Sequence, residues 1–151
     1  MFSRAAKDLF AGWALAGAAL SAHAVGRPAD CIDQAAAYHQ VNAVVLRAMA
    51  WHESGMRSWA VGKNQNGTYD IGLMQINSIH LKELSKYGIG PQHLTDACVS
   101  AYVGAGKYRS KVNKHGNTWT AVGACHSETP VYRDAYAAKI AAIVRQWTTP
   151  K

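Results

Sequence analysis

Acidic residues are scarce in this 151-residue chain, which has 9 Asp and Glu against 16 Lys and Arg. Beyond residue 24 only three glutamates remain, so few carboxyl pairs are available for acid–base chemistry. The seven histidines are dispersed, and the second histidine of an H-E-x-x-H zinc motif would fall on Met56. No glycine-rich phosphate loop is present. We therefore expect no metal and no cofactor.

Long apolar runs are missing too. The longest is the twelve-residue stretch Leu9–Leu20, well short of the roughly 20 residues that span a bilayer. It follows the basic residues Arg4 and Lys7 and precedes Ala22-His23-Ala24, a small-x-small cleavage pattern. Residues 1–24 are therefore predicted to be a cleaved signal peptide. An uncleaved anchor is the alternative.

The remaining chain, residues 25–151, is long enough for one domain with a real core and too short for two. It has a formal charge of +6, because the leader carries +1 of the total +7. A basic exported domain suits an anionic partner. Its lysines and arginines are scattered without a dense run or a nucleic-acid motif, so we do not expect nucleic acid to be that partner. No membrane span is expected after cleavage.

Apolar periodicity predicts a mainly helical fold with a small loop or hairpin region around Asn66-Gly67. Asp30, Asn42 and Thr129 are expected to cap helices, and Gly55 to end one. The last helix should carry one apolar stripe, formed by Tyr132, Tyr136, Ile140, Ile143 and Trp147. The expected helices cover residues 31–38, 43–54, 78–86, 96–113, 119–125 and 130 onward.

Glu53 is a carboxyl on an otherwise apolar helical stripe. Leu46 and Met49 share its face at spacings of three and four, and Gly55 ends the helix just after it. Burial and the negative end of the helix dipole should both raise the pKa of Glu53. A carboxyl that stays protonated near neutral pH can act as a general acid. The alternative is a glutamate reaching solvent at a fraying helix end.

A second motif, D-I-G-L-M-Q-I-N at residues 70–77, begins about twenty residues after Glu53-Ser54. Together the two motifs resemble those of the SLT-type lytic transglycosylases of the goose-type-lysozyme-like class, which cut peptidoglycan glycan strands. The resemblance covers roughly residues 30–140. The small size is similar to that of members accompanying secretion systems, pili or conjugation machines. The resemblance implies a mainly α, lysozyme-like α+β fold, peptidoglycan as partner and a periplasmic location.

In this family one glutamate carries the reaction, and the resemblance gives that role to Glu53. The acid protonates the glycosidic oxygen and then, as a base, takes the proton of the sugar's own C6 hydroxyl. That hydroxyl attacks C1 and gives a 1,6-anhydromuramoyl product. Asp70 is expected to hold its loop, with a second catalytic group as the alternative.

The resemblance also assigns substrate-binding positions. Ser54 should position the acid or the substrate, and Gln75 should lie in the glycan groove. Met74 belongs to the groove or to the core, and Asn77 either contacts substrate or caps the following helix.

Cysteines are few, and the resemblance pairs two of the three. Cys31 and Cys98 stand where the secretion-associated members carry a disulfide, with two free thiols as the alternative. Cys125 stands where the family has a tyrosine close to the catalytic glutamate. A thiol lacks a phenol's reach, so acid positioning should be weakened and Cys125→Tyr should raise turnover. Tyr102 and Tyr136 are predicted to line the substrate-binding site, and either could supply the missing phenol.

The sequence thus predicts a lytic transglycosylase that opens the cell wall locally for a trans-envelope apparatus. One alternative is a hydrolytic muramidase in which Glu53 works with water steered by Asp70. The other is a wall-binding assembly protein with weakened catalysis, which Cys125 favours.

Overall fold

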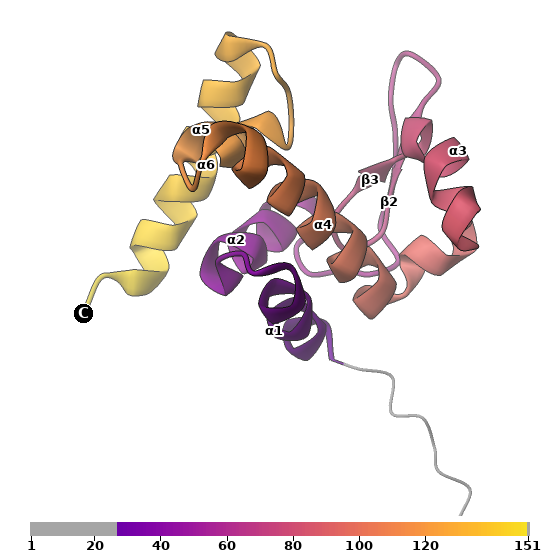
Figure 1. The fold of residues 1–151 in the computed structure, drawn as a ribbon, viewed down its shortest axis with the longest axis horizontal. Helices are drawn as coiled ribbons and strands as arrows, with labels where there is room; N and C mark the ends of the chain where they lie inside the picture. The colour runs from indigo at the N-terminus through magenta and orange to yellow at the C-terminus, as the bar shows by residue number, and fades with distance from the viewer. Residues whose placement is uncertain (1–26, 151) are drawn as a thin grey trace, which may run out of the picture.

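The computed structural model describes residues 27–150, so the predicted signal peptide, residues 1–24, lies outside the described residues. Helices dominate this part of the chain, which confirms the mainly α fold (Figure 1). None of the helices described is both long and apolar enough to cross a membrane. The larger helices are α1 (Pro28–His39), α2 (Ala43–Ser54), α4 (Ala97–His115), α5 (Trp119–Ala124) and α6 (Pro130–Thr148).

A three-stranded antiparallel sheet forms the smaller part of the fold. Its strands β1 (Val61–Lys63), β2 (Tyr69–Ile71) and β3 (Ile76–Asn77) pair in chain order. In this register Val61 lies opposite Ile71, and Asp70 lies opposite Asn77. The hairpin predicted around Asn66-Gly67 is the connection between β1 and β2.

Helix α2 begins and ends where the sequence predicts. The Asn42 side chain accepts hydrogen bonds from the backbone N–H groups of Val44 and Val45, at 2.9 and 3.1 Å. Gly55 ends the helix in the left-handed region, with φ of +60°. Leu46 and Met49 are buried in the core, so the stripe that carries Glu53 faces inward.

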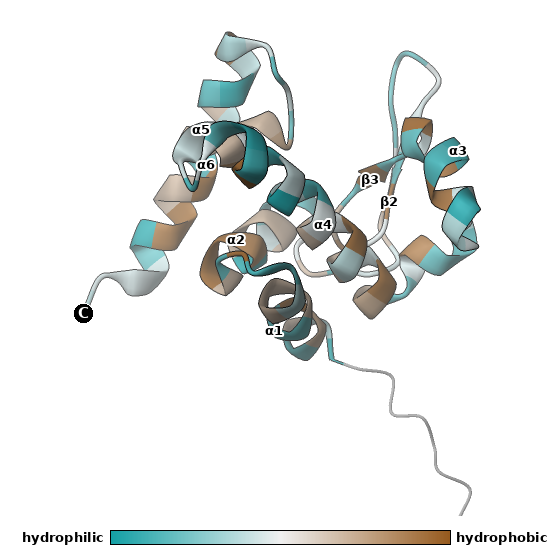
Figure 2. Cartoon of the chain, viewed as in Figure 1, coloured by the Kyte–Doolittle hydropathy of each residue, from teal (hydrophilic) through white to brown (hydrophobic). Residues whose placement is uncertain are grey.

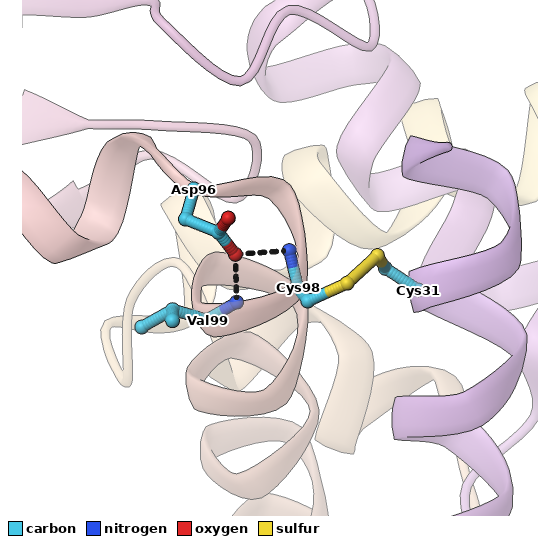
Figure 3. The surroundings of a disulfide bond; sticks show 4 residues. All are labelled: Cys31, Asp96, Cys98 and Val99. Atoms are coloured by element: carbon cyan, nitrogen blue, oxygen red, sulfur yellow. Dashed lines mark hydrogen bonds between the residues drawn. A yellow bond between two sulfur atoms is a disulfide. The ribbon is translucent and has the colours of Figure 1, made fainter. Parts of the chain in front are cut away.

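Helix α4 runs through the middle of the molecule, between the α5–α6 pair and the sheet (Figure 1). Asp96 caps it by accepting the backbone N–H groups of Cys98 and Val99, each at 2.9 Å. Cys98 in its first turn forms a disulfide with Cys31 of α1, 67 residues earlier (Figure 3). A loop of this length is worth about 4 kcal/mol on the chain-entropy model. Apolar residues gather where α1, α2 and α4 meet (Figure 2).

The predicted N-cap Asp30 is wrong, and the predicted N-cap Thr129 has the right position but makes no side-chain hydrogen bond. Helix α1 begins at Pro28, so Asp30 lies within its first turn, where a carboxylate suits the positive end of the helix dipole. Thr129 does precede α6, but its side chain makes no capping hydrogen bond. Pro130 at the first helical position has no N–H to satisfy and a fixed φ, so the helix can start without that bond.

Residues 78–86 do not form the single helix that was predicted. The 3₁₀ helix η1 (Ser78–His80) leads into one α-turn, α3 (Leu81–Leu84), and a second 3₁₀ helix, η2 (Ser85–Tyr87). No residue in these three short elements is fully buried, and only Leu81 and Leu84 pack partly against the core. This contact is too small to enforce a continuous helix. The 3₁₀ helix η3 (Pro91–Thr95) then connects to α4.

The predicted apolar stripe of α6 is buried only in its middle. Tyr136 and Ile140 are in the core, whereas Tyr132 and Trp147 are 62% and 41% exposed. Helix α6 packs against α5 and α2, which are shorter than it is, so its ends extend past them. Trp147 instead contacts the exposed Trp51 of α2 edge to face, with ring centroids 6.3 Å apart.

The turn at residues 72–75 is held from both sides by serine hydroxyls. Ser54 Oγ, at the end of α2, donates to the carbonyl of Leu73 at 2.8 Å. On the other side, Ser100 Oγ of α4 accepts the backbone N–H of Met74 at 3.1 Å. Both serines are buried, with at most 2% of their surface exposed. These two bonds fix the turn between α2 and α4.

Gly72 lets this turn approach the rest of the chain closely. Its φ is +78°, and a Cβ there would lie 1.8 Å from the carbonyl oxygen of Leu94. Gly72 therefore brings backbone against backbone inside the protein.

We predict that Ser54→Ala lowers the free energy of unfolding by about 1–3 kcal/mol, because the buried Leu73 carbonyl loses its donor. Urea unfolding measures this. Ser85→Ala is the matched control: its exposed hydroxyl bonds only the carbonyl of Lys82 nearby, and the change should stay within about 0.5 kcal/mol. If the two substitutions lowered the free energy of unfolding equally, the Ser54–Leu73 hydrogen bond would not stabilise the fold as proposed.

Candidate active site

Glu53 lies in the last turn of α2 and is half-buried. The hydroxyl of Tyr136, on α6, donates a hydrogen bond to Glu53 Oε1 at 2.6 Å. These residues are 83 positions apart, and the packing of α6 against α2 brings them together. The bond fixes the orientation of the carboxyl and leaves its second oxygen, Oε2, without a hydrogen-bond partner among residues 27–150.

Two histidine rings hold the Tyr136 ring. His126 stacks on it with centroids 4.9 Å apart and planes 2° from parallel, and His52 approaches edge-on at 5.4 Å. Burial and the neighbouring Glu53 carboxyl both raise the pKa of Tyr136. The phenol therefore stays protonated and acts as the donor in its bond to Glu53.

Cys125 comes directly after α5, and its thiol donates to the carbonyl of Ala121 at 3.4 Å. Burial raises the pKa of Cys125 to about 12, so the side chain is a neutral thiol. Glu53 already receives a phenol hydrogen bond from Tyr136, one of the two tyrosines considered as substitutes. This changes the expectation for Cys125→Tyr, because a second phenol would find Oε1 already bonded.

Asp70 holds the sheet together. Its Oδ2 accepts a hydrogen bond from Asn64 at 2.9 Å, and its Oδ1 accepts one from Asn77 at 2.7 Å. Asn77 also accepts the backbone N–H of Ile79 and so caps η1. Of the two roles open to Asn77 in the sequence, the structure gives it the capping one.

The other residues of the second motif support the turn. Gln75 has φ of +46°, and its side-chain nitrogen donates to the carbonyls of Ala60 and Gly72 at 3.1 and 2.9 Å. Met74 is 7% exposed and packs against Gly104 of α4, so it belongs to the core. Ser54, Met74, Gln75 and Asn77 thus all make contacts within the chain, and their roles in substrate binding stay predictions.

Tyr102 lies apart from the Tyr136–Glu53 pair. Its ring packs against Tyr38 and His39 of α1, with centroids 5.5 and 6.1 Å away. It also lines a shallow apolar pocket with Ile89 and Val99. The structure therefore brings Glu53 together with Tyr136 and gives Tyr102 a different environment.

The sequence did not point to Lys107, a half-buried lysine of α4. Its Nζ lies 2.8 Å from Nε2 of His80, the last residue of η1. Burial lowers the pKa of Lys107, while the neighbouring Cys125, Asp70 and Glu53 act to raise it. The two residues are 27 positions apart and belong to neither motif, so no local pattern could have paired them.

Metal ligands do not gather in the described part of the chain. Between residues 27 and 150, no group of three or more His, Cys, Asp or Glu side chains could hold an ion.

Known proteins share this sequence over most of its length. The family model described as "Transglycosylase SLT domain" matches residues 30–130. Invasion protein IagB of Salmonella typhimurium (strain SL1344) is 42% identical over 117 residues, which cover 74% of this chain and 73% of that protein. The X polypeptide of Escherichia coli is 41% identical over 113 residues, 74% of this chain and 67% of that protein. Protein IpgF of Shigella sonnei is 36% identical over 102 residues, 67% of either chain. With its mainly helical, lysozyme-like fold, the chain belongs to the family of SLT transglycosylase domains.

Proposed function

We propose that this protein is a peptidoglycan lytic transglycosylase, in which Glu53 cuts the β-1,4 bond between N-acetylmuramoyl and N-acetylglucosamine residues. The observation that carries the proposal is the 2.6 Å hydrogen bond from Tyr136 to Glu53 Oε1. It presents one oriented carboxyl, at the position that carries the acid in this family, with the second oxygen free to hold a proton.

The reaction needs one carboxyl working in two steps. Protonated Glu53 gives its proton from Oε2 to the glycosidic oxygen as the bond from C1 to that oxygen breaks. The carboxylate then takes the proton of the muramoyl C6 hydroxyl while O6 bonds to C1, which gives the 1,6-anhydro product. Glu53 ends the cycle protonated and no water is consumed. Throughout, Tyr136 holds Oε1 and so keeps Oε2 facing the bond.

Five of the seven other acidic side chains among residues 27–150 make structural contacts, and the remaining two, Asp30 and Glu83, are exposed. This favours a single-carboxyl mechanism. Glu128 is exposed and pairs with Lys111, Lys114 and His115. Asp33 pairs with Arg47, Asp134 pairs with Arg133, and Asp96 caps α4. A retaining or inverting hydrolase would need a second free carboxyl beside the first.

The two alternative functions lose support for separate reasons. A hydrolytic muramidase would need Asp70 to steer water, yet both Asp70 oxygens accept side-chain hydrogen bonds from asparagines. A wall-binding protein with weakened catalysis rested on the missing tyrosine at Cys125. Tyr136 provides a phenol at Glu53 from another helix.

We infer further that the protein works in the periplasm and opens the wall locally for a trans-envelope apparatus. The signal-peptide pattern of residues 1–24 and the disulfide between Cys31 and Cys98 support export to an oxidising compartment. The similarity to a protein named as an invasion protein supports the inference that this protein acts together with an apparatus that crosses the envelope.

We predict that the purified protein releases anhydromuropeptides from peptidoglycan and that Glu53→Gln abolishes this release, because an amide cannot exchange the proton. Mass spectrometry of the soluble products measures both. Glu83→Gln, which changes an exposed glutamate, is the control and should leave the products unchanged. Equal release by the wild type and Glu53→Gln would remove Glu53 from the mechanism.

We also predict that Tyr136→Phe lowers turnover by roughly tenfold to a hundredfold, the range expected when a hydrogen bond to an ionisable group is lost. The rate of anhydromuropeptide release measures this. Tyr132→Phe, an exposed tyrosine one turn earlier on α6, is the control and should leave the rate unchanged. Matching rates for the two variants would mean that the bond to Glu53 does not position the acid.

A further inference from the structure

We propose that Lys107 and His80 form a binding site for a carboxylate carried by the muramoyl part of the glycan. The proposal rests on the proposed function, since it names the acidic substrate group that this side of the site recognises. Lys107 comes from α4 and His80 from η1, which follows directly after the G-L-M-Q-I-N motif. Two basic side chains from different elements thus meet beside the candidate active site.

The contact between them leaves donors of Lys107 unused. An ammonium group has three N–H donors and no acceptor. At 2.8 Å, one of them is donated to Nε2 of His80, which can accept only when the ring is neutral. Burial and the charge of Lys107 both lower the pKa of His80, which favours that neutral form. Two donors of Lys107 therefore remain for a ligand.

Lys107 has no carboxylate partner among the described residues, although it is half-buried and two other lysines of the same helix are paired. Lys111 and Lys114, on the same helix, both pair with Glu128. The two carboxyls that act on Lys107 electrostatically, Asp70 and Glu53, are hydrogen-bonded elsewhere. A half-buried cation without an anion pays a desolvation cost that an incoming carboxylate would offset.

The position of Lys107 indicates which carboxylate would reach it. Lys107 lies one turn along α4 from Gly104, which packs against Met74 of the second motif, and the Glu53 and Asp70 carboxyls act on its charge. A group bound to Lys107 would therefore lie on the side of the site that this motif forms. The sugar rings of the glycan are neutral, and its acidic groups hang from the muramoyl residue. They are the lactyl carboxyl, where no peptide is attached, and the carboxyls of the stem peptide. Both sources present the same chemistry to Lys107 and His80.

Binding measured in a Glu53→Gln background tests the proposal without cleavage. Three probes are compared by calorimetry: a neutral N-acetylglucosamine hexamer, peptide-free glycan strands with lactyl carboxylates, and peptide-bearing strands. Lys107→Met keeps the aliphatic stem and should weaken binding of a carboxylate-bearing probe roughly tenfold, as expected for a lost charge-assisted hydrogen bond. The same substitution should change the affinity for the neutral hexamer by no more than about twofold. Whichever acidic probe loses affinity identifies the source of the carboxylate.

Two matched variants make the result specific. Lys114→Met removes the same charge from an exposed position on α4 and should leave all three affinities unchanged. Lys107→Arg should keep most of the preference for the acidic probe. Three results would overturn the proposal. Lys107→Met could weaken binding of neutral and acidic probes equally, Lys114→Met could weaken binding of the acidic probe as much as Lys107→Met does, or Lys107→Met could leave all affinities unchanged. Failure of the proposed function would show separately, as wild-type protein that releases no anhydromuropeptides.

Discussion

The fold depends on two serine hydroxyls that form hydrogen bonds with the backbone of one turn, residues 72–75. Ser54 at the end of α2 donates to the Leu73 carbonyl, and Ser100 of α4 accepts the N–H of Met74. Both contacts are buried, where an unpaired backbone group would be costly. They join the two sequence motifs into one rigid unit. Glu53 directly precedes Ser54, so the hydrogen bond from Ser54 to the turn also fixes the end of α2 that carries the Glu53 carboxyl.

The domain has few acidic residues, and several of them have separate structural or chemical roles. Asp70 accepts hydrogen bonds within the sheet region and Asp96 caps α4. Glu128 pairs with basic side chains in the last turns of α4. Glu53 differs from these because it accepts a single hydrogen bond among the described residues, from a neutral phenol, which orients the carboxyl and leaves its second oxygen unbonded. This division suits a reaction in which one carboxyl both gives and takes a proton. Lys107 has no carboxylate partner within residues 27–150, and its free donors would suit the anionic groups of the proposed substrate.

Local patterns predicted much of this fold because the interactions behind them are local. Asn42 and Gly55 delimit α2 through bonds within a few residues of each end, so the sequence is enough to find them. The single helix predicted over residues 78–86 is divided into three short elements, because only Leu81 and Leu84 pack against the core and no residue of the segment is fully buried.

The candidate site was harder to predict because its contacts span the chain. The choice between Tyr102 and Tyr136 depends on which helix packs against α2, and no periodicity within α4 or α6 encodes that. The resemblance places Gln75 in the glycan groove and leaves Asn77 either there or as a helix cap. In the structure the Gln75 side chain is bonded to neighbouring backbone, and Asn77 is bonded to Asp70 and caps η1. The pairing of Lys107 with His80 depends on how η1 lies against α4.

The most direct test of the central claim is to run the reaction in H₂¹⁸O and analyse the muramoyl products by mass spectrometry. We predict anhydromuramoyl ends without label, since the sugar's own O6 attacks C1. A hydrolytic muramidase treated in the same way provides the labelled standard. Muramoyl reducing ends carrying ¹⁸O from this protein would contradict the account, because they would show that water is the nucleophile on the same Glu53 scaffold.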